Sequence, residues 1–570
     1  MAITHDDYRR ARYICEEAAK NLAVAIYPDN RGGRSMDPLI FLVGLFLTMD
    51  KYNAQHLTKV HEVLTQDLPR EIQWDLGVLY FGTGGEVKVL TMNDLYQLSK
   101  RITKKLDFTL ARAKHLSRKD RHKRREYLDD FIYDILKPTL PPRPEGSIDY
   151  AMDGTGIWAS EKGKKGKPKD IPTQLLHDEM IEVSEFQNDE DFPELPSNIG
   201  KDADGKELPG RGCRGASDAH WGYKTAKSGE PEIYFGYDAE TICRVPKIRL
   251  EKGEARSEPN LIESLVVIPG ATNIINPCLR MIDRMAARGL PVGNLLVDRN
   301  YSYKEFSKWA IELLKRNISQ VADMHPNDQK FKDWDGMKIA AGWAHCPCTP
   351  ERLGTIFTLG PAATVEEEAI FNANIQERQA YAAQKVSPLS IDGKVRFSCP
   401  ALNGTVGCPL RDGSVATAIS LGLPIIKDPP GEIGRPAICT QKTVQLHVET
   451  KDQMIAMKMS QKHYWGSAAW RLNYRRRTYI EGCFGVLKSP TATGHDRGTH
   501  QFQGMPLVTI AIAVSAATTN MRLLRSWQAQ TTLGDPAHPL LIPDAEFFGL
   551  KELDRESAEL IDQVAKRTAA

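Results

Sequence analysis

The sequence has no apolar run long enough to cross a bilayer. Its longest runs, residues 38–47 and 508–517, have 10 residues each, against roughly 20 for a membrane-spanning helix. The first 30 residues are polar and helical in pattern, without the apolar centre of a signal peptide. Cysteine is scarce, with 10 irregularly spaced residues in 570, which argues against a disulfide framework. These absences predict a soluble cytoplasmic protein with no membrane partner.

An excess of charge of either sign is also missing. The chain has 75 Lys and Arg against 73 Asp and Glu, a net charge of +2, so a nucleic-acid surface must come from local clustering. Residues 100–125 form the strongest basic cluster, in a segment with a helical pattern. This cluster is either a solvated helical face or a DNA-binding region that neutralises phosphates. In the second case the candidate contacts are Arg118, Lys119, Lys123 and Arg124.

The length of 570 residues predicts about three to four domain-sized units. Residues 1–146 have a mostly helical pattern and end in a proline-rich linker, which predicts an N-terminal helical domain. Residues 147–326 alternate between strand and helix patterns, apart from a polar loop at about 160–215 that is expected to be mobile. The predicted strands are 147–160, 220–226, 232–245, 292–302 and 318–324, and the predicted helices are 273–289 and 304–316.

The rest of the chain divides into three parts. Residues 327–462 are rich in proline and glycine with strand-like surroundings, and they predict an insertion domain. Residues 463–527 return to a helical pattern and end in a buried helix, which continues the α/β domain. Residues 528–570 form a C-terminal tail without recognisable chemistry.

Two aspartates occupy strand positions that a core strand would not give to an acid. Asp153 precedes Gly-Thr-Gly in a strand pattern, and Asp298 closes the apolar run Leu-Leu-Val. A lone aspartate at such a place is often a helix cap or a turn former. Joined with Glu481, however, they form a set of three carboxylates that can bind Mg²⁺ through few protein ligands. Two ions held in this way can activate a water or a 3′-hydroxyl.

Glu481 lies in the segment LNYRRRTYIEGCFGVLK, residues 472–488. On a regular helix Tyr474, Arg477, Glu481 and Lys488 fall within roughly 60° of one another. A tyrosine, two cations and a carboxylate on one stripe predict a surface that holds phosphates. The alternative is a simple i,i+4 ion pair between Arg477 and Glu481.

The motifs AMDGTG, LLVDRNYS and Y-x2-R-x3-E-x6-K together resemble the DDE transposases of bacterial insertion sequences. The similarity is to the IS-four-like group named for its YREK signature, and it covers residues 147–527 without the insertions. It implies an α/β fold with a ribonuclease H-like catalytic domain, a mixed sheet flanked by helices, besides the helical N-terminal and strand-rich insertion domains. One departure is Asn300, where the family usually has glycine; asparagine tolerates the left-handed conformation such a turn needs.

The resemblance implies that Asp153, Asp298 and Glu481 are catalytic and coordinate two Mg²⁺ ions, which Mn²⁺ can replace. Tyr474, Arg477 and Lys488 would contact phosphates of the transposon end. The implied partner is double-stranded DNA, bound by a dimer or larger assembly in the nucleoid of a bacterial cytoplasm. The implied activity is endonucleolytic cleavage at terminal inverted repeats and joining of the 3′-hydroxyl to target DNA. The alternatives are an inactive or domesticated DNA-binding descendant and a metal-dependent nuclease without strand transfer.

Cysteines and tryptophans leave two further questions open. Cys346, Cys348, Cys399, Cys408 and Cys439, with His345 and His447 nearby in the sequence, can form a structural zinc site. Their spacings are not those of a usual zinc knuckle, and buried unligated cysteines are the alternative. Trp465 and Trp470 either stack on a flipped nucleotide or belong to the core.

Overall fold

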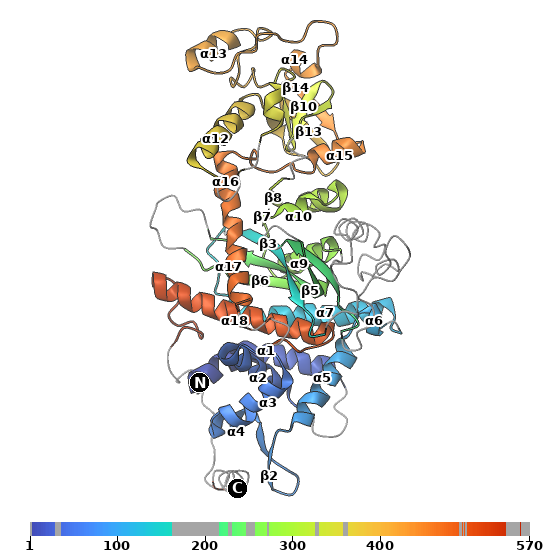
Figure 1. Ribbon diagram of the computed structural model, residues 1–570, viewed down its shortest axis with the longest axis vertical. Coiled ribbons are helices and arrows are strands. Elements are labelled where there is room, and N and C mark those ends of the chain that lie inside the picture. The colour runs from blue at the N-terminus through green and yellow to red at the C-terminus, as the bar shows by residue number, and fades with distance from the viewer. Residues whose placement is uncertain are drawn as a thin grey trace. The chain divides into compact units, whose positions relative to one another are not determined.

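The computed structural model in Figure 1 describes most of the chain. The described residues are 3–28, 36–113, 115–146, 148–161, 216–225, 231–246, 257–270, 273–324, 330–356, 359, 363–489, 493, 495, 499–542 and 559. The loop predicted at about 160–215 therefore falls almost wholly outside them, as does most of the predicted tail. The chain forms two compact units. Unit 1 comprises Met1–Ser147, Asp153–Ala287 and Tyr479–Ala570, and unit 2 comprises Ile148–Met152 and Arg288–Thr478.

Unit 1 begins with a set of helices whose apolar residues recur with helical spacing. In α5, for example, Leu95, Leu98, Ile102 and Leu106 are buried, and Thr91 and Asp94 form a reciprocal capping box at its start. The elements are α1 (His5–Ile26), α2 (Pro38–Tyr52), α3 (Leu57–Glu62), the π-helix η1 (Val63–Asp67), α4 (Arg70–Leu76), the hairpin β1 (Leu79–Phe81) and β2 (Val87–Val89), α5 (Met92–Leu106), α6 (Leu110–Ala113), α7 (Arg118–Leu136) and the 3₁₀ turn η2 (Lys137–Thr139).

The remaining elements of unit 1 are strands and the helices that pack on them. They are β3 (Asp149–Trp158), β4 (His220–Thr225), β5 (Pro231–Arg244), β6 (Ile262–Pro269), α9 (Ile275–Ala287), α17 (Thr478–Leu487) and α18 (Met505–Thr531). β5 pairs antiparallel with both β4 and β6. The later part of β3 lies beside β5, and its first residues, Asp149–Met152, belong to unit 2.

Helix α18 is the central core element of unit 1. It contacts α2, α5 and α7 as well as β6, so it lies between the N-terminal helices and the sheet (Figure 1). Among the described residues it is the one helix long and apolar enough to cross a membrane, but its most apolar stretch is 89% buried inside the protein. The sequence-based prediction of a buried helix here is confirmed, and α18 is a core helix.

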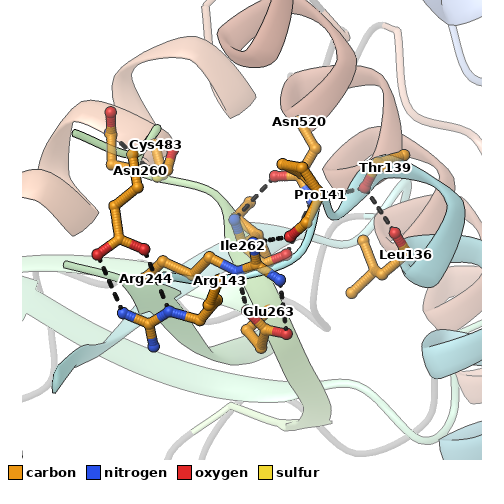
Figure 2. Close-up of polar contacts among 11 residues, drawn as sticks. Leu136, Thr139, Pro141, Arg143, Arg244, Asn260, Ile262, Glu263, Cys483 and Asn520 are labelled. Atoms are coloured by element: carbon orange, nitrogen blue, oxygen red, sulfur yellow. Dashed lines mark hydrogen bonds and ion pairs between the residues drawn. The ribbon is translucent and has the colours of Figure 1, made fainter. Parts of the chain in front are cut away.

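Polar side chains fix α18 to the sheet at one buried point (Figure 2). The Asn520 carboxamide accepts the Ile262 N–H at 2.8 Å, and it donates to the Ile262 carbonyl at 2.8 Å and to Thr139 Oγ1 at 2.9 Å. Beside it the buried Arg244 guanidinium pairs with Glu263 and donates to the Pro141 carbonyl. The proline-rich linker that follows residue 136 is therefore held against the sheet, because buried polar groups require such partners.

A second buried polar cluster gives a pH-dependent prediction. Asp107 Oδ1 accepts the Thr109 N–H and hydroxyl, while Arg112 lies 3.8 Å from both Asp107 and Asp218. Burial, with the Asp218 charge adding to it, raises the pKa of Asp107 to about 6. A raised carboxyl pKa means that the folded state binds the proton more tightly, so stability is lost as pH rises through that pKa.

Asp107→Asn keeps the acceptor oxygen but carries no charge. We expect it to match the wild type near pH 4 and to be more stable above pH 6, by on the order of 2–3 kcal/mol. Melting temperatures of both proteins across this pH range test the prediction. A difference that does not grow with pH would contradict it.

Unit 2 contains the start of β3 and two strands parallel to it. Asp149–Met152 of β3 pairs with β7 (Asn294–Val297), and β7 pairs with β8 (Ser319–Ala322). The sheet order is thus β4-β5-β3-β7-β8, with β6 also on β5. Between β7 and β8 lie α10 (Arg299–Ser302), the π-helix η4 (Phe306–Ala310) and α11 (Ile311–Lys315).

The rest of unit 2 contains two small antiparallel sheets and short helices around a shared apolar core. The first sheet is β9 (Lys332–Trp334), β10 (Met337–Ala340) and β11 (Trp343–His345); the second is β12 (Gln384–Ser387), β13 (Lys394–Ser398) and β14 (Thr443–His447). The helices are η6 (Glu351–Gly354), α12 (Val365–Ala380), α13 (Ser414–Leu421), α14 (Ala437–Thr440), α15 (Lys451–Met457), α16 (Ala468–Tyr474) and the 3₁₀ turn η7 (Arg475–Arg477).

The protein is therefore an α/β protein with mixed and antiparallel sheets, as predicted at that level. A strand or helix is present at each of the five predicted strands and two predicted helices of the α/β region. The strand predicted over 292–302 ends at Val297, however, and the helix predicted over 304–316 begins as the π-helix η4. The predicted order omits β6. Its sequence IESLVVIP places Glu263 and Ser264 before the short apolar run Leu265–Ile268, and it lacks the regular alternation that identifies a strand.

Candidate functional site

Three aspartates follow aligned positions on three neighbouring parallel strands. Met152 of β3 pairs with Val297 of β7, and Val297 pairs with Ala322 of β8. The next residues along the three strands are Asp153, Asp298 and Asp323. The register therefore aligns the residues that precede these three aspartates across the parallel strands. Two of them are the aspartates predicted from the sequence, and Asp323 is an addition.

Asp298 is the N-cap of α10. Its Oδ1 accepts the Asn300 N–H at 2.8 Å, so the cap role typical of a strand-ending aspartate is present. Burial raises the pKa of the Asp298 carboxyl, and the Asn300 N–H, Arg477 and Lys304 oppose that shift. Asn300 itself has helical geometry in α10 and is not among the residues with positive φ. The left-handed turn expected at Asn300 is therefore wrong.

Tyr474 and Arg477 lie close to Asp298 in unit 2. The Tyr474 ring stacks on Trp470 with ring centroids 4.7 Å apart and an interplanar angle of 11°. The Arg477 guanidinium lies 5.7 Å from the Tyr474 ring centroid. Burial raises the pKa of Tyr474 well above its usual range, and Asp323 and Asp298 add to the shift while Arg477 opposes it. A tyrosine, an arginine and two aspartates thus share one neighbourhood.

The expectation of one regular helix through the YREK residues is wrong. Tyr474 is the last residue of α16, Arg477 ends the 3₁₀ turn η7, Glu481 lies in α17, and Lys488 directly follows α17. The physical reason for the interruption is the contact of Arg476. Its side chain is buried and donates a hydrogen bond of 2.6 Å to the Asp149 carboxylate on β3. A 3₁₀ turn winds more tightly than an α-helix, and here it turns Arg476 toward the sheet.

The three consecutive arginines therefore have different surroundings. Arg476 is bound to Asp149, which also accepts the Asn294 side-chain amide, so the turn is tied to both β3 and β7. Arg477 faces Tyr474 and Asp298. The Arg475 side chain is exposed. The contact between Arg476 and Asp149 holds this turn against the strands, and the motif spacing alone did not reveal it.

Asp153 is half-buried and accepts the Gly154 N–H at 2.8 Å. The two glycines after it make room for side chains of β5. A Cβ on Gly154 would lie 2.5 Å from a carboxylate oxygen of Glu240, and one on Gly156 would lie 2.6 Å from the Tyr234 ring. The two glycines of the Asp-Gly-Thr-Gly motif are therefore needed for packing against β5, whatever the role of the Asp153 carboxylate.

Glu481 and Lys488 belong to unit 1 with Asp153. Glu481 is exposed on α17, whose position is fixed by the Asn260 amide donating to the Tyr479 carbonyl at 3.2 Å. Lys488 is half-buried, and it adds to the burial that lowers the pKa of His495 to about 3. Within the part of the chain that the structure describes, no three His, Cys, Asp or Glu side chains are gathered closely enough to hold a metal ion.

The four N-terminal residues predicted to contact DNA have two kinds of surroundings. Arg118, Lys119 and Lys123 are exposed at the start of α7, and Lys104 and Lys105 lie at the end of α5. Arg124 differs from the first three, because its guanidinium donates to the Lys104 carbonyl at 3.0 Å and to the Asp107 carbonyl at 2.9 Å. It joins the two helix ends and so holds the exposed cations together.

Trp465 and Trp470 are core residues, with exposed fractions of 1% and 7%. Trp465 Nε1 donates to Asp323 at 3.2 Å, and Trp470 Nε1 donates to Gln461 at 3.2 Å. Their burial favours the packing interpretation over stacking on a nucleotide. Asp323, which also pairs with Arg299 at 2.6 Å, thereby connects β8 to the segment before α16.

Comparison with protein-family models, curated protein sequences and solved structures gives no match. Function is therefore inferred from the geometry of the chain itself.

Proposed function

We propose that this protein is a DDE transposase that binds the terminal inverted repeats of an insertion sequence, cleaves the DNA at the element ends and joins the 3′-hydroxyl to target DNA. The observation that supports the proposal most is the strand register, in which Met152, the residue before Asp153, pairs with Val297, the residue before Asp298. Arg477 and Tyr474, from the segment that leads to Glu481, lie next to Asp298.

The strand order supports a ribonuclease H-like catalytic domain. β3 is the central first strand, β5 and β6 continue the sheet on one side, and the parallel strands β7 and β8 continue it on the other. In this assignment Asp153 lies on the first strand, and Asp298 ends the fourth, with β4 an additional edge strand. The segment between β8 and α16 is then the insertion domain.

The donor set suits Mg²⁺, which prefers carboxylate oxygens and keeps positions for water and phosphate. Asp153, Asp298 and Glu481 would hold two ions, which when bound activate the attacking water or hydroxyl and stabilise the leaving oxygen. Two of these carboxylates directly follow the paired residues Met152 of β3 and Val297 of β7, and α17 would supply the third. Asp323 would be a positioning residue, because Arg299 and Trp465 already occupy its carboxylate.

The cations beside the carboxylates would hold the DNA strand. Arg477 is kept in place by the Tyr474 ring, which is itself fixed on Trp470. A guanidinium fixed in this way can donate charge-assisted hydrogen bonds to phosphate with little loss of freedom. Lys488 would add a second phosphate contact further along the chain.

The exposed cations of α5 and α7 would make the sequence-independent contacts to duplex DNA. Replacing Arg118, Lys119 and Lys123 by alanine should weaken binding and lower the slope of log K against log salt by about 0.9 for each phosphate that is no longer neutralised. Lys20→Ala, which removes an exposed lysine on α1, is the matched control. Binding measured over a range of salt concentrations tests this, and an unchanged slope would identify a solvated face. Arg124 is left intact because its backbone contacts support the fold.

The proposed function itself is tested with a duplex that carries the inverted repeats flanking the coding sequence. Purified protein with Mg²⁺ should cleave the repeat end and join it to a second duplex. Cleavage without joining would indicate a nuclease, and binding without either reaction would indicate an inactive descendant. The assay thus separates the proposal from both alternatives.

A further inference from the structure

Gln55 is a fully buried polar residue in the loop between α2 and α3, and none of the chemistry proposed above uses it. A buried glutamine has to satisfy two donor hydrogens and an acceptor oxygen inside the protein. The partners of Gln55 lie more than 400 residues later in the chain, in the stretch that follows α17 and in α18. This residue therefore connects the N-terminal helices of unit 1 to its C-terminal helices.

The Gln55 carboxamide makes hydrogen bonds at three separate points. Its Nε2 donates to the Thr493 carbonyl at 2.7 Å and to Ser515 Oγ at 3.2 Å. Its Oε1 accepts the Nδ1–H of His500 at 2.8 Å. The three partner residues are fully buried as well. Because water cannot replace these partners, removal of the carboxamide would leave buried polar groups unpaired.

The backbone of Gln55 makes two more hydrogen bonds to the same stretch. Its N–H donates to the Thr499 carbonyl at 2.8 Å, and its carbonyl accepts the Gln501 N–H at 3.0 Å. These two bonds lie on either side of His500, which forms a parallel β-bridge with Gln55. The backbone and the side chain of one residue thus hold the chain after α17 at several points.

Thr493 connects this contact to the end of α17. Its hydroxyl donates to the carbonyl of Leu487, the last residue of α17. The next residue, Lys488, is still bonded to the helix, because its N–H donates to the Phe484 carbonyl at 2.8 Å. Gln55, Thr493 and Leu487 therefore form a chain of hydrogen bonds that ends one residue before Lys488.

The helices on either side of Gln55 include neighbours of the exposed cations. α2 packs on α18, and α3 packs on α5, whose last turn carries Lys104 and Lys105. Gln55 thus joins the helices proposed to capture DNA to α17, the helix that carries Glu481.

We propose that Gln55 is a positioning residue: through Thr493 it fixes the end of α17 and so directs Lys488 toward the phosphate of the bound strand. The inference rests on the proposed function, in which Lys488 contacts phosphate. A side chain whose helix end is fixed before DNA binds loses less freedom on binding, and it reaches the geometry of the reaction more often. Gln55 acts through Lys488 and takes no part in the chemistry itself.

Gln55→Leu in the full-length protein removes the carboxamide at similar side-chain size. It should slow single-turnover cleavage of the element end by about 3- to 10-fold, the effect of losing one buried hydrogen bond, and leave the Kd for end DNA nearly unchanged. Gln73→Leu is the matched control, because Gln73 is a buried glutamine that donates to the Thr65 and Leu68 carbonyls within the N-terminal helices. It should lower the melting temperature in the same way and leave cleavage unchanged.

A double-mutant cycle separates positioning from a general effect on the fold. If Gln55 acts through Lys488, Gln55→Leu/Lys488→Ala should cleave no more slowly than Lys488→Ala alone, since residues that act through one another are not additive. Thr493→Val loses the hydroxyl that binds the Leu487 carbonyl and should slow cleavage as Gln55→Leu does. Thr493→Ser keeps the hydroxyl and should cleave as the wild type does. If Gln55→Leu fails to fold, Thr493→Val takes its place in the cycle.

The outcomes distinguish this inference from the proposed function. With a wild type that cleaves, effects of Gln55→Leu and Lys488→Ala that multiply would overturn the positioning role alone. An equal loss of cleavage in Gln73→Leu at equal melting temperature would do the same. Wild-type protein that binds end DNA with Mg²⁺ but does not cleave it would overturn the proposed function, and this inference with it.

Discussion

Asp298→Asn is expected to abolish cleavage of the element end while leaving DNA binding nearly unchanged. Asparagine can still accept the Asn300 N–H, so the cap of α10 survives, but the charge needed to hold Mg²⁺ is lost. Loss of several kcal/mol of metal-assisted stabilisation corresponds to a rate decrease on the order of 10³-fold or more. Asp153→Asn and Glu481→Gln should behave in the same way. Single-turnover cleavage with Mg²⁺ is the measurement.

Asp323→Asn is the matched control for that experiment. Asp323 follows Ala322 of β8, which pairs with the residue before Asp298. Its carboxylate already accepts hydrogen bonds from Arg299 and Trp465. Its substitution should lower the melting temperature and change cleavage much less than Asp298→Asn. Asp298→Asn with near-wild-type cleavage would remove the carboxylate from the proposed chemistry.

Arg477→Ala is expected to slow cleavage by about 10- to 150-fold, since a charge-assisted hydrogen bond contributes about 1.5–3 kcal/mol. The Arg477 guanidinium lies over Tyr474 and within electrostatic reach of Asp298. Capture of DNA should change little, because the exposed cations of α5 and α7 would dominate it. Lys488→Ala should show the same pattern with a smaller decrease.

Arg475→Ala is the control for Arg477→Ala, because both remove an arginine from the same turn but the Arg475 side chain is exposed. Melting, binding to end DNA and single-turnover cleavage should be compared for the two variants. Equal cleavage by both, at unchanged stability, would mean that the YREK spacing has no functional content. Unfolding of Arg477→Ala alone would indicate a structural role instead.

The sequence was informative where a feature depends on local pattern. An acid within or directly after an apolar strand pattern is visible without a structure, so Asp153 inside β3 and Asp298 after β7 could be singled out. Asp323 also ends a strand, but its alignment with the other two depends on the register of β7 with β8. Strand register between segments far apart in sequence is set by packing, which no local pattern reveals.

Contacts between distant parts of the chain also explain why the 3₁₀ turn and the role of Arg124 were not predicted. The 3₁₀ turn at Arg475–Arg477 follows from the contact between Arg476 and Asp149, which are 327 residues apart. Helical spacing alone could not anticipate it. Arg124 was predicted as a DNA contact from its charge, whereas its two carbonyl partners depend on how α5 and α7 pack.

The most direct test of the central claim is a change of metal preference in Asp298→Cys. Thiolate is a poor ligand for Mg²⁺ and a better one for softer ions such as Mn²⁺. If Asp298 binds the catalytic metal, Asp298→Cys should fail to cleave element-end DNA with Mg²⁺ and regain cleavage with Mn²⁺, whereas Asp323→Cys should respond to the two ions as the wild type does. Equal cleavage by Asp298→Cys with Mg²⁺ and Mn²⁺ would contradict the account.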